Sequence, residues 1–145
     1  MQNSKGFTLL EMLLVMSIIA VILIGVTRYY ESAATSHKEN EAVRLILALK
    51  AAGERYRVGQ INESTDILPN LINRNLVPVS AKTNPWGGTV TAAMAADGKI
   101  TVTLATIPAA VCRSLVSIIS TDIANSTATC SAADTDATGD FAVNF

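Results

Sequence analysis

One stretch near the N-terminus limits what this chain can fold into. From Phe7 to Val26, every residue is uncharged except Glu11. A helix of about 20 residues is roughly 30 Å long, which matches the hydrocarbon core of a bilayer. Apolar residues would occupy every face of this helix, which is not the pattern of an amphipathic surface helix. The run is therefore either a membrane span or a helix wholly buried by other protein.

Glu11 is the exception within this run. A carboxylate in hydrocarbon costs several kcal/mol unless it finds a partner, so it is a functional candidate. Cleavage of the chain after Gly6 would create a positively charged amino group at Phe7. Within one molecule, that amine and Glu11 would lie on about the same helix face, one turn apart. Between molecules, the amine could meet Glu11 of a neighbouring helix inside an apolar bundle. Leaving either charge unpaired there costs roughly 3–5 kcal/mol, so the pair would fix the axial register between subunits.

The residues around Glu11 resemble the signature of type IV pilins and pseudopilins. A short leader ending in Lys5-Gly6 precedes Phe7-Thr8-Leu9-Leu10-Glu11 and the apolar run. The resemblance implies cleavage between Gly6 and Phe7 by a prepilin peptidase, and N-methylation of Phe7. It also implies that the helix packs into a filament core, where Glu11 answers a neighbour's amino terminus. An ordinary single-span anchor with a chance Glu is the alternative interpretation.

The charge pattern suggests how the chain is oriented in the inner membrane. Lys5 precedes the run and weakly favours a cytoplasmic N-terminus, although Arg28 follows the run. The C-terminal bulk would then be periplasmic before assembly and extracellular in a pilus. Tyr29 and Tyr30 are either membrane-interface anchors or packing residues of a filament. With 11 basic and 12 acidic side chains, the composition gives no reason to expect a nucleic-acid partner.

Helical periodicity continues beyond the apolar run. Apolar positions recur at steps of three and four, which predicts one buried face: Ala42, Leu45, Ile46, Leu49, Ala52 and Tyr56. We expect one helix from about residue 7 to 58, with a protruding apolar half and an amphipathic half that forms the spine of a domain. The expected organisation is a leader over 1–6, a membrane or filament-core part over 7–30, and the remaining helix with a head over 31–145.

The segments after the helix predict a small mixed domain. Asp66 or Thr65 can cap a short helix over 67–73. Asn84-Pro85-Trp86-Gly87-Gly88 reads as a turn in which Trp86 is a packing anchor. Asp97-Gly98, flanked by alternating runs over 89–95 and 99–106, predicts a β-hairpin.

The C-terminal third completes the expected fold. Pro108 opens a helix that extends to about Ile119, and Phe141–Phe145 alternates like a final strand. The polar stretch over 121–136, which contains Cys130, is expected to be a loop. Cys112 and Cys130 allow one pairing, which an oxidising compartment favours over two free thiols. The predicted fold class is α+β, a long N-terminal helix on a small antiparallel sheet with a C-terminal disulfide.

This layout resembles that of type IVb pilins, especially those of thin conjugative pili and adhesive bundles. The turn around Trp86, the hairpin, the helix start at Pro108 and the second cysteine before a final strand carry the likeness. The six-residue leader and Phe7 instead resemble the IVa class and the pseudopilins.

The sequence holds no catalytic constellation, so we expect neither an enzyme nor a cofactor. His37 is the single histidine and lies in a polar helical stretch, where a solvated or subunit-facing role is expected. Asp134, Asp136 and Asp140 alternate as in a calcium loop, but Phe145 stands where such a loop has its acidic twelfth residue. An exposed acidic loop is the alternative to this weak calcium candidate.

The expected function is that of a structural subunit of a type IVb-like pilus, used for adhesion, aggregation or mating contact. Its partners would be further copies of itself, the prepilin peptidase, and an inner-membrane assembly platform with its ATPase; the membrane would store the monomer. The alternatives are a pseudopilin of a type II secretion system and a minor ligand-binding pilin. The latter would need a basic cluster, for which only Lys50, Arg55 and Arg57 are available.

Overall fold

The computed structural model describes residues 7–57, 66–95, 97–123, 125–131 and 138–145. These residues form two compact units, Met1–His37 and Lys38–Phe145. We refer to the second unit as the head domain. One helix, α1 (Leu9–Arg57), contributes to both units and continues through Gly25 without a break. The predicted helix over residues 7 to 58 is therefore confirmed from Leu9 to Arg57. It begins two residues later than predicted, and residue 58 lies outside the described residues.

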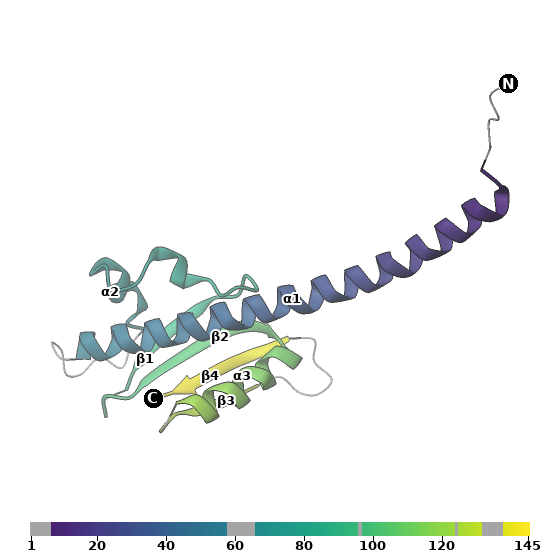
Figure 1. The fold of residues 1–145 in the computed structure, drawn as a ribbon. Coiled ribbons are helices and arrows are strands. Elements are labelled where there is room, and N and C mark those ends of the chain that lie inside the picture. The colour runs from purple at the N-terminus through teal and green to yellow at the C-terminus, as the bar shows by residue number, and fades with distance from the viewer. Residues whose placement is uncertain (1–6, 58–65, 96, 124, 132–137) are drawn as a thin grey trace. The chain divides into compact units, whose positions relative to one another are not determined.

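The head domain contains a four-stranded sheet, with strands β1 (Val90–Met94), β2 (Ile100–Pro108), β3 (Thr127–Cys130) and β4 (Thr138–Asn144). The strand order is β1-β2-β4-β3, and every neighbouring pair is antiparallel. Strands β1 and β2 form the predicted hairpin, and β4, which includes most of the predicted final strand, pairs with β2 (Figure 1). The α+β prediction is thus confirmed.

One face of this sheet forms the core with two helices. Strand positions alternate between buried and more exposed residues, as expected for a sheet covered on one side. The Lys38–Arg57 part of α1 contributes the predicted apolar stripe, and α3 (Ala109–Asp122) contributes a second one. The buried residues of these helices are Ala42, Ile46, Leu49, Ala52, Gly53, Tyr56, Ala109, Val111, Cys112, Leu115 and Ile119. Leu45 of the predicted stripe is half-buried. The opposite face of the sheet carries threonines, which are exposed or half-buried: Thr91, Thr101, Thr103, Thr127 and Thr129.

Two short helices connect α1 to the hairpin. Helix α2 (Leu68–Asn73) begins one residue later than predicted, and its cap position, Ile67, makes no side-chain cap hydrogen bond. The Asp66 carboxylate, one residue earlier, accepts the N–H of Leu68 at 3.1 Å, and Thr65 lies outside the described residues. A 3₁₀ helix, η1 (Val79–Lys82), follows. The structure brings Gly53 of α1 so close to Ile100 that a Cβ there would lie 2.7 Å from the Ile100 Cδ1 atom. Glycine at this position lets helix and hairpin approach each other closely.

Two predictions from the C-terminal third need correction. The segment over 121–136 is not a loop throughout, because Thr127–Cys130 forms β3. Its Thr-Ala-Thr-Cys sequence is too short and too polar to stand out as a strand, and pairing with β4 decides its conformation. Helix α3 continues past Ile119 to Asp122.

Candidate functional site

The apolar segment, Phe7 to Val26, is exposed along its whole length. Its large side chains keep much of their surface, for example 81% at Phe7 and 80% at Leu9. By length and composition, α1 is the one helix in the described part of the chain that is apolar enough to cross a membrane. Such a surface needs either lipid or other protein around it.

Thr8 caps the start of α1. Its Oγ1 atom accepts the N–H of Glu11 at 3.3 Å, and its carbonyl accepts the N–H of Met12 at 3.2 Å. Thr8-Leu9-Leu10-Glu11 therefore fits the Ser/Thr-x-x-Glu pattern of a capping box. The role of Thr8 was missed from the sequence, although this spacing signals it. The cap places Glu11 in the first turn of the helix, where a negative charge is favoured by the helix dipole.

The predicted processing site lies at the edge of the described residues. Gly6 falls outside them, whereas Phe7 is described and exposed. The Glu11 carboxylate makes no hydrogen bond or ion pair with any residue in the described ranges. Cleavage at Gly6 and Phe7, methylation of Phe7 and the register role of Glu11 stay predictions.

Cys112 and Cys130 are joined by the predicted disulfide. Cys112 lies in the first turns of α3 and is fully buried, and Cys130 is the last residue of β3. Their Cα atoms are 5.9 Å apart, within the usual range for a disulfide. The bridge attaches the edge strand β3 to the helix that covers the core.

Of the three residues of the calcium candidate, the structure describes Asp140, whereas Asp134 and Asp136 lie outside the described residues. The Asp140 carboxylate accepts the N–H of Thr106 at 3.1 Å. Thr106 sits at the irregularity between Leu104 and Ile107 in the β2–β4 pairing and has a φ of 59°. Asp140 thus supports a bulged backbone. Within the described ranges, no three acidic, His or Cys side chains are grouped to hold a metal.

Trp86 packs against the core as predicted, and the Asn84 side chain holds the turn before β1 together. The Asn84 side chain is buried, accepts the N–H groups of Trp86 and Gly88 at 2.9 and 3.0 Å, and donates to the carbonyl of Ala105 at 2.6 Å. Trp86 is half-buried against the core. Asparagine's tendency to bond backbone in turns was a signal for this role, but its long-range contact to β2 was not readable from the sequence.

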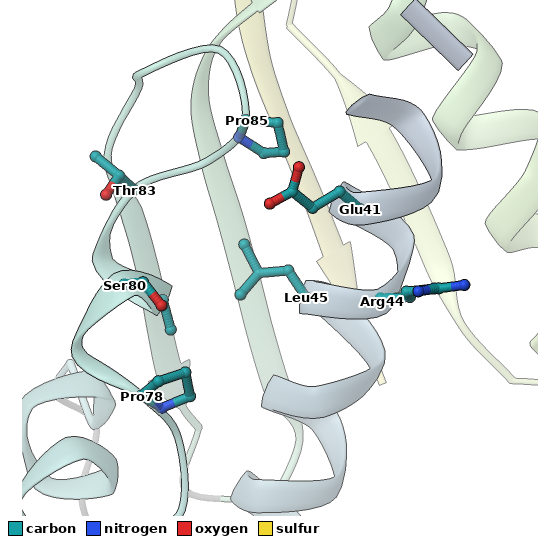
Figure 2. A pocket seen from close by; sticks show the side chains of 8 residues that line it. Glu41, Arg44, Leu45, Pro78, Ser80, Thr83 and Pro85 are labelled. Atoms are coloured by element: carbon teal, nitrogen blue, oxygen red, sulfur yellow. The ribbon is translucent and has the colours of Figure 1, made fainter. Parts of the chain in front are cut away.

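A groove of about 270 Å³ lies between α1 and the segment around η1. Figure 2 shows Glu41 and Leu45 directed from α1 toward this segment, whereas Arg44 points away from it. The lining residues are Glu41, Arg44, Leu45, Pro78, Ser80, Ala81, Thr83 and Pro85. Sequence reasoning missed this groove because its two sides come from distant segments. It is open and mixed in polarity, and its residues provide no nucleophile–base pair.

A minor ligand-binding pilin would need Lys50, Arg55 and Arg57 as a basic cluster. Lys50 and Arg57 already make contacts within the head domain. The Lys50 ammonium lies 4.8 Å from the centre of the Phe145 ring, a cation–π contact. Arg57 donates to the carbonyl of Gly98 at 3.3 Å, at the hairpin turn. His37 is exposed on α1.

Comparison with known proteins gives two findings. Residues 1–27 match the family described as the prokaryotic N-terminal methylation motif. The chain is also 31% identical over 91 residues to the "Major structural subunit of bundle-forming pilus" of Escherichia coli O127:H6, and equally to that of Escherichia coli O111:H-. Each match covers 58% of this chain and 47% of the relative, so the chain spans about half the length of these curated relatives.

The fold agrees with both findings. A long helix with an exposed apolar start continues into a head domain, where it packs on an antiparallel sheet with a C-terminal disulfide. The match over residues 1–27, the partial similarity to the two bundle-forming pilus subunits and this fold all agree with the resemblance to type IV pilins that the sequence carries.

Proposed function

We propose that this chain is the structural subunit of a type IVb-like surface filament. The observation that carries the proposal is the apolar segment, which is exposed throughout and contains a single charge, Glu11. A lipid bilayer can cover this surface in the monomer. A bundle of identical helices can cover it in a polymer, because each copy offers the same unsatisfied surface.

The first step is maturation. A prepilin peptidase removes residues 1–6, and the new amino group of Phe7 is methylated. The apolar segment stays in the inner membrane with the head domain on the periplasmic side. An assembly platform and its ATPase then move the helix out of the bilayer into the filament.

Glu11 provides register in this polymer. A heterologous contact repeated by a screw operation builds a filament. The carboxylate of Glu11 meets the charged amino terminus of a neighbouring Phe7, and any axial slip would leave both charges unpaired in an apolar environment. The head domains then form the outer surface and serve adhesion, aggregation or mating contact, in keeping with relatives whose names refer to a bundle-forming pilus.

The test is intact mass spectrometry combined with electron microscopy of a sheared surface fraction. The expected result is a species that starts at methylated Phe7, contains one disulfide and is present in thin fibres. Recovery of the mature chain only from membranes, without fibres, would contradict the proposal and favour a pseudopilin.

A further inference from the structure

The sheet of the head domain has two edges, which differ in whether other described residues hydrogen-bond to them. The order β1-β2-β4-β3 places β1 at one edge and β3 at the other. An edge strand offers a row of backbone N–H and C=O groups that can pair with a further strand.

The β1 edge is already occupied. The outward N–H of Ala92 donates to the Asp66 carboxylate at 3.2 Å, and the Ala92 carbonyl accepts the N–H of Ile67 at 2.7 Å. The chain just before α2 thus takes the place of a neighbouring strand. No further strand can pair there without displacing it.

The β3 edge has no such cover among the described residues. Ser131 donates its N–H to the carbonyl of Asp140, so this opposed pair is hydrogen-bonded. Hydrogen-bonded pairs alternate in an antiparallel ladder, so Thr127 and Thr129 bond to β4. The N–H and C=O groups of Ala128 and Cys130 therefore point away from β4, and they have no partner within the described ranges.

The sequence of this edge lacks the usual protection against pairing. Charged side chains, proline and bulges are the common devices that block an edge strand. Residues 125–131, Asn-Ser-Thr-Ala-Thr-Cys-Ser, contain neither a charge nor a proline. The disulfide from Cys130 to Cys112 also holds β3 in place beside α3, so the edge is presented in a fixed conformation.

We propose that the β3 edge is a docking site for the β3 edge of a second copy of this chain, paired antiparallel with Thr129 opposite Thr129. In this register Ala128 of each copy faces Cys130 of the other, so all their outward N–H and C=O groups pair. The two Thr129 side chains meet on the outer face, where they are exposed. Opposed threonines are a favourable cross-strand pair, and the absence of charge avoids repulsion between identical edges.

This pairing has a direction, and here the inference rests on the proposed function. When two identical edges pair antiparallel, the two copies are related by a two-fold axis perpendicular to the sheet. The Lys38–Arg57 part of α1 lies along the sheet (Figure 1), so it runs in opposite directions in the two copies. Copies within one filament all run the same way. The contact therefore joins two filaments of opposite polarity, such as filaments from facing cells.

The variant that tests this docking site is Ala128→Pro. Proline removes one N–H that points outward and leaves the bonds from Thr127 and Thr129 to β4 intact; edge strands tolerate proline at such positions. Ala128→Val is the matched control, because it retains the N–H. We expect Ala128→Pro to form single filaments in normal yield, while the filament concentration needed for lateral association rises at least about tenfold. Ala128→Val should associate like the unaltered chain.

Lateral association of Ala128→Pro at the unaltered concentration would overturn the proposal, as would bundles whose filaments all share one polarity. A second measurement uses the full-length unaltered chain in detergent and needs neither filaments nor a variant. Amide hydrogen exchange at Ala128 and Cys130 should slow as protein concentration rises, while exchange at Thr129 stays slow throughout. Concentration-independent exchange at Ala128 and Cys130 would also overturn the proposal. Failure of the unaltered chain to form filaments would instead count against the proposed function.

Discussion

Asn84 stabilises the head domain through the hydrogen bonds of its buried side chain. Among the described residues it is the one buried polar side chain, and its amide joins three backbone groups. These bonds hold the turn before β1 against the end of β2. Gly88 is needed in the same place, because a Cβ there would collide with the carbonyl of Ala105.

We predict that Asn84→Ala lowers the free energy of unfolding by about 2–3 kcal/mol. The substitution leaves the N–H of Gly88 and the carbonyl of Ala105 without their partner, and an unsatisfied buried group costs about 1–3 kcal/mol. Thermal and chemical unfolding of the detergent-solubilised chain measures the change. Lys82→Ala, at an exposed position of the adjacent η1, should stay within about 0.5 kcal/mol of the unaltered chain. Equal stability of the two variants would refute the role of Asn84.

Gly6 carries the second prediction at this scale. If the peptidase cleaves between Gly6 and Phe7, then Gly6→Leu places a bulky side chain at the cleaved bond and should block maturation. Intact mass spectrometry of the membrane fraction would then find the precursor at its full mass. Appearance of a product that starts at Phe7 in this variant would contradict the requirement for a small residue.

Strand β3 is the element whose position depends most on contacts with other elements. Its four residues are exposed or half-buried, so burial contributes little to its position. Pairing with β4 and the disulfide to α3 hold it instead. The hairpin of β1 and β2 is different, because its turn also stabilises it locally. There the backbone N–H of Lys99 donates to the Asp97 carboxylate and holds the pKa of Asp97 below its ordinary value.

We predict that replacing both cysteines by serine costs roughly 2–4 kcal/mol, because the disulfide restricts the unfolded chain. The loss should be largest at β3, where amide exchange of Thr127 and Thr129 should become faster than in the hairpin. The unaltered chain under reducing conditions serves as the comparison and should behave like the variant. A midpoint of thermal unfolding equal to that of the oxidised chain would show that the bridge does not support the head domain.

At the scale of the whole molecule, α1 combines two surfaces that require different environments. Its Lys38–Arg57 part buries one stripe in the head domain, whereas its Leu9–Val26 part is exposed on all sides. The apolar stripe of the first part is buried within one chain. The second part needs lipid or further copies, so the single chain is an incomplete unit.

We predict that Glu11→Ala leaves maturation largely intact but stops efficient assembly. The variant removes the charge that selects the axial register, while the apolar surface that drives burial is kept. Filament yield from a sheared surface fraction, relative to the mature chain in membranes, is the measurement. Glu31→Ala is the matched control, because Glu31 is an exposed acid of the same helix outside the apolar segment. A normal filament yield from Glu11→Ala would show that the Glu11 charge is not needed to set the axial register between subunits.

The sequence by itself determined the parts of this protein that depend on local pattern. The apolar run and the stripe from Ala42 to Tyr56 specified α1, and Asp97-Gly98 specified the hairpin, because helical and strand periodicity are readable from neighbouring residues. Two cysteines sufficed to predict the bridge between Cys112 and Cys130. The Thr8 cap was also readable, although it was missed.

Only the tertiary structure decided features that join distant segments. Strand β3 has a weak pattern of its own and becomes a strand through pairing with β4. The placement of Asp66 and Ile67 on Ala92 covers one edge of the sheet, and the order β1-β2-β4-β3 leaves Ala128 and Cys130 at the other. These contacts depend on long-range hydrogen bonds and burial, which follow from how the chain closes on itself and have no short-range signature in the sequence.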